Sequence, residues 1–122
     1  MEWQFRSDQP IYTQLTARLT QAIIAGEFQP GERLPTVRDL AVEAGVNPNT
    51  VQRALTELER DGLVFSQRTA GRFVTENVHM IENARFRAAD ECVAGFLAEM
   101  KKLGCSREEI LALLQNRKEE EE

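Results

Sequence analysis

The sequence predicts a mainly α-helical fold with a small β-wing, and three features of the 122-residue chain lead to this prediction. First, residues 34–62 hold two short amphipathic helical patterns separated by a glycine, which is the arrangement of a helix-turn-helix. Second, two β-prone runs around a polar loop follow directly and predict a hairpin. Third, one long and one short apolar helical pattern complete the chain. The predicted architecture is a winged helix-turn-helix at residues 1–76 followed by a two-helix dimerisation tail at 77–122.

The first helix of the predicted helix-turn-helix begins after Thr36. Asp39 stands three residues later, which is the spacing of a capping box, in which the hydroxyl accepts from a free backbone N–H and the acid reaches back. Gly45 then ends the helix, because glycine adopts the left-handed conformation without steric cost. Arg38 lies on the polar face, opposite an apolar face formed by Val37, Leu40, Ala41 and Ala44.

The second helix begins at Asn47, a strong N-cap residue, with Pro48 at the first helical position. It ends at Asp61-Gly62. Its apolar stripe consists of Val51, Ala54, Leu55 and Leu58. The opposite face and its flanks form a hydrogen-bonding surface near the start of the helix, made by Asn49, Thr50, Gln52 and Arg53.

Another helix is predicted to precede this motif, and a hairpin to follow it. Asp8 and Pro10 predict the start of a helix over residues 11–25. Residues 1–9 are expected to pack as an extended arm onto the body of the protein. Residues 33–34 are predicted as a short extended piece after a Pro-Gly turn. The hairpin runs are residues 63–65 and 72–75. Two candidate nucleic-acid contacts, Arg68 and Arg72, lie on or beside the tip, with small residues between them.

The tail from residue 77 carries an apolar stripe that is too wide for a helix lying alone in water. Gly104 ends this helix, and Ser106 with Glu109 forms a capping box for a second one. About 45 residues cannot form a stable core alone, so the tail packs either on its own winged helix or on a second copy. We favour the second copy, because two-fold dimers suit paired DNA half-sites. The dimerisation residues would be Ile81, Ala88, Cys92, Phe96 and Met100.

Composition excludes several classes of protein. The chain has 42% hydrophobic and 29% charged residues, and no apolar run approaches the roughly 20 residues that a membrane span needs. We therefore expect a cytoplasmic protein without membrane contact. Cys92, Cys105 and His79 lack metal-ligand spacing, and no catalytic motif occurs, so we expect no metal, no cofactor and no enzymatic activity. Cys92 is expected to be buried on the apolar stripe, and Cys105 to lie in a loop.

The net charge of −5 is unfavourable for binding a polyanion, but the charge is unevenly distributed. Residues 33–72 contain six arginines and five acidic residues, a net +1. Residues 77–122 contain seven basic and ten acidic residues, a net −3, and four of these acids close the chain. The acidic charge is thus concentrated away from the predicted helix-turn-helix.

These motifs resemble a known family over nearly the whole chain. The run ERLPTVRDLAVEAGVNPNTVQRALTELERDGLV, preceded by PIYTQLTARLTQAIIAGEFQPG and followed by GRFV, resembles the winged helix of GntR-family bacterial transcription regulators. The VNPNTVQRAL run and the short tail resemble its YtrA subfamily. The resemblance implies a homodimer that binds an inverted-repeat operator, usually as a repressor and often of neighbouring ABC-transporter genes. It also implies DNA contacts at Arg38, at the start of the second helix of the motif, and at Gly71. The sequence departs from better-known members at Pro48 and Gln52, where arginines often stand.

Two functional hypotheses follow from these residues. In the first, double-stranded DNA is the partner, with Asn49, Thr50, Gln52 and Arg53 at base edges or phosphates in the major groove. In the second, the winged helix is a protein-interaction module, which the acidic net charge would suit. A regulator of another winged-helix family, such as MarR, is a further alternative. A small-molecule effector stays an open expectation, since no residue pattern in the tail indicates which ligand would bind.

Overall fold

Residues 1–118 are the part of the chain that the computed structural model describes. Within them the elements follow in the order α1 (Ile11–Ile24), α2 (Val37–Ala44), α3 (Pro48–Arg60), β1 (Val64–Gln67), β2 (Gly71–Val74), α4 (Val78–Lys102) and α5 (Arg107–Gln115). This confirms the predicted mainly α-helical fold with a β-wing. The chain forms two compact units, Met1–Arg85 and one that begins at Phe86, inside α4. The functional division at residue 76 stays a prediction.

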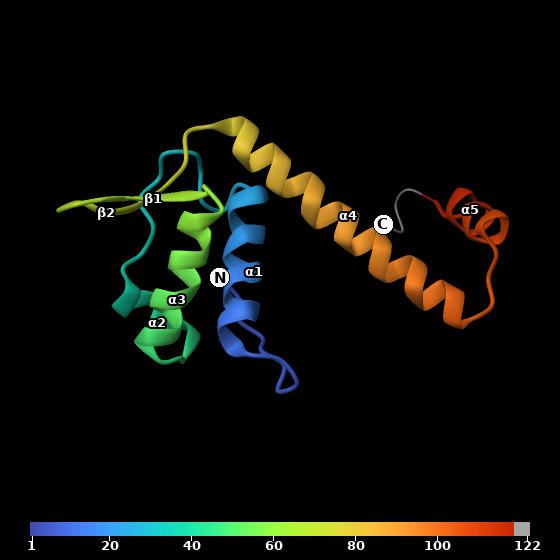
Figure 1. The fold of residues 1–122 in the computed structure, drawn as a ribbon, viewed down its shortest axis with the longest axis horizontal. Coiled ribbons are helices and arrows are strands. Elements are labelled where there is room, and N and C mark those ends of the chain that lie inside the picture. The colour runs from blue at the N-terminus through green and yellow to red at the C-terminus, as the bar shows by residue number, and fades with distance from the viewer. Residues whose placement is uncertain (119–122) are drawn as a thin grey trace. The chain divides into compact units, whose positions relative to one another are not determined.

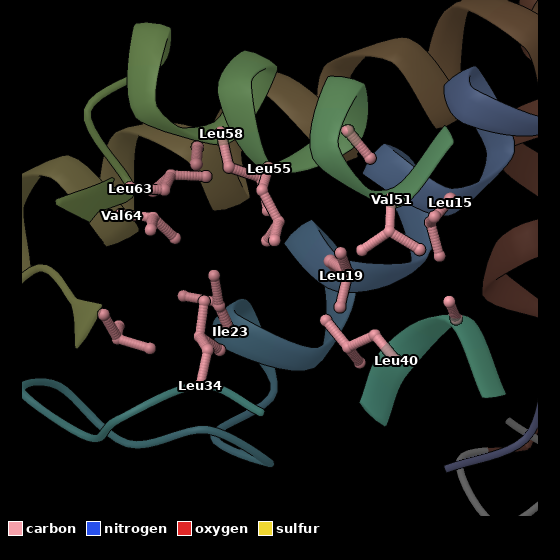
Figure 2. Close-up of a cluster of buried hydrophobic side chains, with 14 residues drawn as sticks. Leu15, Leu19, Ile23, Leu34, Leu40, Val51, Leu55, Leu58, Leu63 and Val64 are labelled. Atoms are coloured by element: carbon pink, nitrogen blue, oxygen red, sulfur yellow. The ribbon is translucent and has the colours of Figure 1, made fainter. Parts of the chain in front are cut away.

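The first unit is built around a core between α1, α2 and α3. Helices α1 and α3 lie side by side, with the hairpin extending beyond them (Figure 1). The buried side chains come from all three helices, from residue 34 and from the hairpin, and they point toward one another in Figure 2: Leu15, Leu19, Ile23, Leu34, Leu40, Val51, Leu55, Leu58, Leu63 and Val64. The predicted stripes of the helix-turn-helix therefore face inward, which turns their polar faces to solvent.

The ends of α2 and α3 follow the local sequence. Thr36 Oγ1 accepts a hydrogen bond from the Asp39 backbone N–H at 3.0 Å, and Asn47 Oδ1 accepts one from the Asn49 N–H at 2.8 Å. The return bond of the predicted capping box, in which the Thr36 backbone N–H would donate to the Asp39 carboxylate, is not formed within residues 1–118. Gly45 has a φ of 70°, in the left-handed region that favours glycine. Each helix of the motif thus starts where its cap residue predicts.

The N-terminal arm packs on the core as predicted. Trp3 and Phe5 stack with ring centroids 6.2 Å apart, and both lie against the buried cluster. Trp3 Nε1 donates a hydrogen bond to Glu43 Oε1 at 3.2 Å, which joins the arm to α2. The arm therefore adds aromatic surface to a small core.

The hairpin gains a third, short edge from the segment before α2. Strands β1 and β2 are antiparallel, with Phe65 opposite Phe73. The Leu34 N–H donates to the Arg72 carbonyl at 2.8 Å, and the Val74 N–H donates to the Glu32 carbonyl at 2.9 Å. The predicted extended piece at residues 33–34 therefore pairs with β2. This pairing ties the wing to the start of the helix-turn-helix.

The second unit contains the rest of α4 and the whole of α5. Ser106 and Glu109 form the predicted capping box, with both reciprocal hydrogen bonds present. A groove of about 410 Å³ lies between the two helices and is lined mainly by apolar side chains: Cys92, Val93, Phe96, Leu97, Arg107, Ile110, Leu111 and Leu114. Ile110 is buried, whereas Leu111 and Leu114 stay about half exposed. This unit covers only part of its apolar surface.

The cysteine and stripe predictions need correction in the single chain. Cys92 is exposed in the single chain, so the expected burial of its thiol is wrong there, because α5 leaves the groove that Cys92 lines partly uncovered. Cys105 is half-buried. At the start of α4, Ala84 is buried and Ile81 packs against the core of the first unit. The alternative that the tail packs on its own winged helix therefore holds for these two residues.

Among the described residues, no helix is both long and apolar enough to span a membrane.

Replacing Gly62 by alanine should lower the free energy of unfolding by about 1–2 kcal/mol. Gly62 follows α3 with a φ of 79°, and an added Cβ would also meet the Met80 side chain. The matched control is Gly95→Ala within α4, because an added Cβ there meets nothing within 4 Å. Urea denaturation should show Gly95→Ala neutral or stabilising. Equal destabilisation by both changes would contradict the role given to Gly62.

Candidate nucleic-acid interface

The polar face of α3 is held outward by the burial of its opposite stripe. Asn49, Gln52 and Arg53 are exposed, and Thr50 is half-buried. Because Val51 and Leu55 are fixed in the core, the polar side chains keep a constant direction relative to the fold. Side chains of this type suit base edges, since Asn and Gln can pair bidentately with adenine. The structure thus brings these four predicted site residues together on one exposed surface.

Asn47 has a structural role as well as a predicted contact role. Its side-chain oxygen accepts the capping bond from the Asn49 N–H, so its amide N–H remains for another partner. Arg38 is exposed on α2 and forms no ion pair within the described residues. A positive charge without a carboxylate partner is available to a phosphate. Both residues therefore fit the predicted interface.

The wing presents its three predicted residues in different ways. Arg68 lies exposed in the turn between β1 and β2, and Gly71 is exposed with a φ of 105°. Arg72 is half-buried, and its Nε donates to Glu59 Oε1 at 2.6 Å. Ser66 Oγ donates to the same oxygen at 2.7 Å. Arg72 therefore fastens the wing to α3, whereas Arg68 is the wing arginine that extends into solvent.

The ion pair changes the acidity of Glu59. The hydrogen bond from the Arg72 guanidinium lowers the pKa of the Glu59 carboxyl below its ordinary value, and the Ser66 hydroxyl acts in the same direction. A carboxyl with a depressed pKa in the folded state adds stability above its unfolded pKa, and this stability is lost as the pH falls through the folded pKa. The wing attachment should therefore weaken in acid.

Replacing Glu59 by glutamine should lower the free energy of unfolding by about 0.5–1 kcal/mol at pH 7. The difference from the wild type should shrink as the pH falls below the ordinary glutamate pKa of 4.5, because the unfolded-state carboxyl then binds a proton before the folded-state carboxyl, whose pKa is lowered. Urea unfolding at several pH values measures this. The matched control is Glu57→Gln, since Glu57 forms a surface ion pair with Arg60 at 3.0 Å. A difference between wild type and Glu59→Gln that stays constant down to pH 3 would contradict the assignment.

Sequence reasoning missed two residues at this interface. Arg33 is exposed beside the wing, and a Cβ added at Gly71 would lie 3.2 Å from Arg33 Nε. Tyr12 on α1 lies under Arg53, whose Cζ is 3.6 Å from the ring centroid. Neither contact has a local sequence signal, because each joins segments far apart in the chain. The only sequence signal for Arg33 was that an arginine in the predicted extended piece had no structural explanation.

Comparison with known proteins shows that the chain is similar to transcription regulators. Residues 11–74 match the family described as "Bacterial regulatory proteins, gntR family". The chain is 38% identical to YhcF of Bacillus subtilis, an uncharacterized HTH-type transcriptional regulator, over 91% of this chain and 92% of YhcF. It is 42% identical to the HTH-type transcriptional repressor YtrA of the same organism, over 59% of this chain and 55% of YtrA. These similarities support the resemblance to the YtrA subfamily.

Solved structures agree with the fold. A GntR family transcriptional regulator from Listeria monocytogenes superposes with a TM-score of 0.86 at 34% identity, covering 93% of this chain and 100% of that one. AraR(DBD) in complex with operator ORX1 superposes with a TM-score of 0.57 at 28% identity, covering 62% of this chain and 96% of that one. A fold of this kind is therefore known in a complex with operator DNA.

Proposed function

Because this chain belongs to the GntR family of bacterial regulatory proteins, we propose that it represses transcription by binding an inverted-repeat operator as a homodimer. The chain is a transcriptional regulator with a winged-helix DNA-binding domain. The observation that carries the proposal is the exposed polar face of α3, together with the exposed wing arginine Arg68, which forms no ion pair within residues 1–118. The similar protein YtrA is named a repressor, which supports the same mode of action here.

In the proposed complex, α3 lies in the major groove. Asn49 and Gln52 read base edges through amide hydrogen bonds, which discriminate by about 1–3 kcal/mol per good bidentate pair. Arg38 holds a phosphate or an outer base, and the wing brings Arg68 to the minor groove. With Pro48 and Gln52 where better-known members of the family often have arginines, base reading relies on amides and hydroxyls more than on charge.

The proposed dimer forms through the second unit. Phe96 and Leu111 remain 40% and 50% exposed in the single chain, and both line the apolar groove between α4 and α5. A contiguous apolar surface of this kind marks an interaction site. A second copy offers the same groove in return, as a two-fold interface requires. Two joined winged helices then match the two halves of an inverted repeat.

Two alanine substitutions test the docking face by gel shift. The probe is a duplex selected by the wild-type protein from a random pool. Arg38→Ala should weaken binding to all related duplexes, because it removes a charge, whereas Gln52→Ala should relax the preference at one base pair. The matched control is Arg87→Ala, which removes the same charge from an exposed position on α4 and should leave the affinity for DNA unchanged. If Arg38→Ala and Gln52→Ala both bind like the wild type, the assigned face is wrong.

Salt dependence separates this proposal from the protein-interaction alternative. DNA binding through phosphates should weaken steeply between about 50 and 200 mM salt, because binding releases counterions. Absent or salt-insensitive duplex binding would favour an interaction module, which the net charge of −5 would suit. An ABC-transporter operon next to the gene is the proposed target, and a selected half-site repeated in its promoter would support that target.

A further inference from the structure

Arg53 differs from the other arginines of the interface in what it contacts. Its guanidinium carbon lies 3.6 Å from the centroid of the Tyr12 ring, well inside the distance at which a cation is attracted to an aromatic face. Tyr12 belongs to α1 and is half-buried, whereas Arg53 belongs to α3 and is exposed. The two helices lie side by side in Figure 1. The head of Arg53 is therefore drawn from the polar face of α3 toward α1.

The charge of Arg53 is oriented by this contact but not neutralised. Within the described residues Arg53 forms no ion pair, in contrast to Arg72, which is bound to Glu59 at 2.6 Å. A guanidinium that stacks on a ring keeps its in-plane N–H donors free at the edge. Stacking also restricts a flexible side chain before binding, which reduces the entropy lost when the complex forms. Arg53 is thus a preorganised cationic donor.

We infer that Tyr12 is a positioning residue that holds Arg53 for a phosphate of the DNA backbone beside the major groove, and not for a base. This inference rests on the proposed docking of α3. Within the described residues, the side chains of Asn49 and Gln52 form no hydrogen bond that draws them away from the centre of the polar face, and they are left to read bases. The head of Arg53 leans toward the neighbouring helix, at the flank where the backbone borders a groove-bound helix. Arg53 then adds affinity without sequence preference.

The test uses the full chain and the duplex selected from a random pool. Arg53→Met, which keeps the apolar stem, should lower affinity about tenfold on the selected duplex and on its single-base variants alike. The plot of log affinity against log salt concentration should become less steep, and the magnitude of its negative slope should decrease by about 0.9. Tyr12→Phe keeps the ring and should bind like the wild type. Tyr12→Leu should lose about three- to fivefold.

A double-mutant cycle separates positioning from a structural role of the ring. If Tyr12 acts through Arg53, Tyr12→Leu should cause no further loss in the Arg53→Met background. An equal loss in both backgrounds would overturn the inference, and so would Tyr12→Phe binding as weakly as Tyr12→Leu. Thermal unfolding of each variant confirms that the compared proteins are folded.

The remaining outcomes distinguish this inference from the proposed function. If Arg53→Met relaxes the preference at one base pair and leaves the salt slope unchanged, Arg53 reads a base and the phosphate assignment is wrong. If Arg53→Met has no effect while Arg38→Ala and Gln52→Ala do, the proposed function stands and this inference fails. If all three changes have no effect, the docking face itself is wrong.

Discussion

Phe96→Asp should convert the proposed dimer to a monomer. Phe96 lines the apolar groove of the second unit and is 40% exposed in the single chain, so a second copy would bury it. Burying a carboxylate there without a partner should weaken self-association by about 100-fold or more. Light scattering coupled to size-exclusion chromatography measures the mass directly. Operator affinity should fall by about 10²–10⁴, because the two half-sites would then be bound independently.

The matched control for Phe96→Asp is Ala98→Asp. Ala98 is exposed on the same helix and lies about 200° around it from Phe96, away from the groove-lining stripe. This variant introduces the same charge and should remain dimeric. Dimers of unchanged stability for Phe96→Asp would contradict the proposed interface, and monomers of both variants would point to a general effect of charge on α4.

Replacing Leu55 by alanine should lower the free energy of unfolding by about 2–5 kcal/mol. Leu55 is 1% exposed and belongs to the core between α1, α3 and the hairpin (Figure 2). The change removes buried methyl groups and leaves a cavity that a small core cannot collapse around. A domain of this size has a total stability of only about 5–15 kcal/mol, so the loss is a large fraction of it. Urea denaturation measures the loss.

Val42→Ala is the control in the same unit, because Val42 is 77% exposed on α2. It should change the free energy of unfolding by less than about 0.5 kcal/mol. DNA binding by Leu55→Ala should recover on cooling to the temperature at which the protein is folded. Weak binding by a fully folded Leu55→Ala protein would contradict a purely structural role for this leucine.

Local interactions explain why much of the fold was predictable. The caps at Thr36 and Asn47 act within two or three residues, so the starts of α2 and α3 can be located without knowledge of the tertiary structure. The glycine after α2 and the periodic apolar stripes are local signals of the same kind. The inward face of each helix, and with it the outward polar face of α3, followed from periodicity.

The chemistry of the interface was less predictable, because it depends on contacts between distant segments. The sequence marked Arg72 and Arg53 as candidate nucleic-acid contacts and gave no sign of their partners within the protein. The structure pairs Arg72 with Glu59 and stacks Arg53 on Tyr12. Arg33 lies beside Gly71 because the segment before α2 pairs with β2. Periodicity reports which face a residue occupies but not which side chain lies opposite it.

Caps, turns and apolar periodicity operate over a few neighbouring residues, so the amino-acid sequence predicts the architecture, the starts of α2 and α3, and the solvent-facing sides of these two helices. The partner of each arginine and the covered part of the apolar stripe depend on packing between distant segments. Ile81 and Ala84 pack against the core of the first unit, whereas Cys92 is exposed. Burial thus depends on which other elements lie against a residue. Packing across the chain sets these outcomes, and no local pattern encodes them.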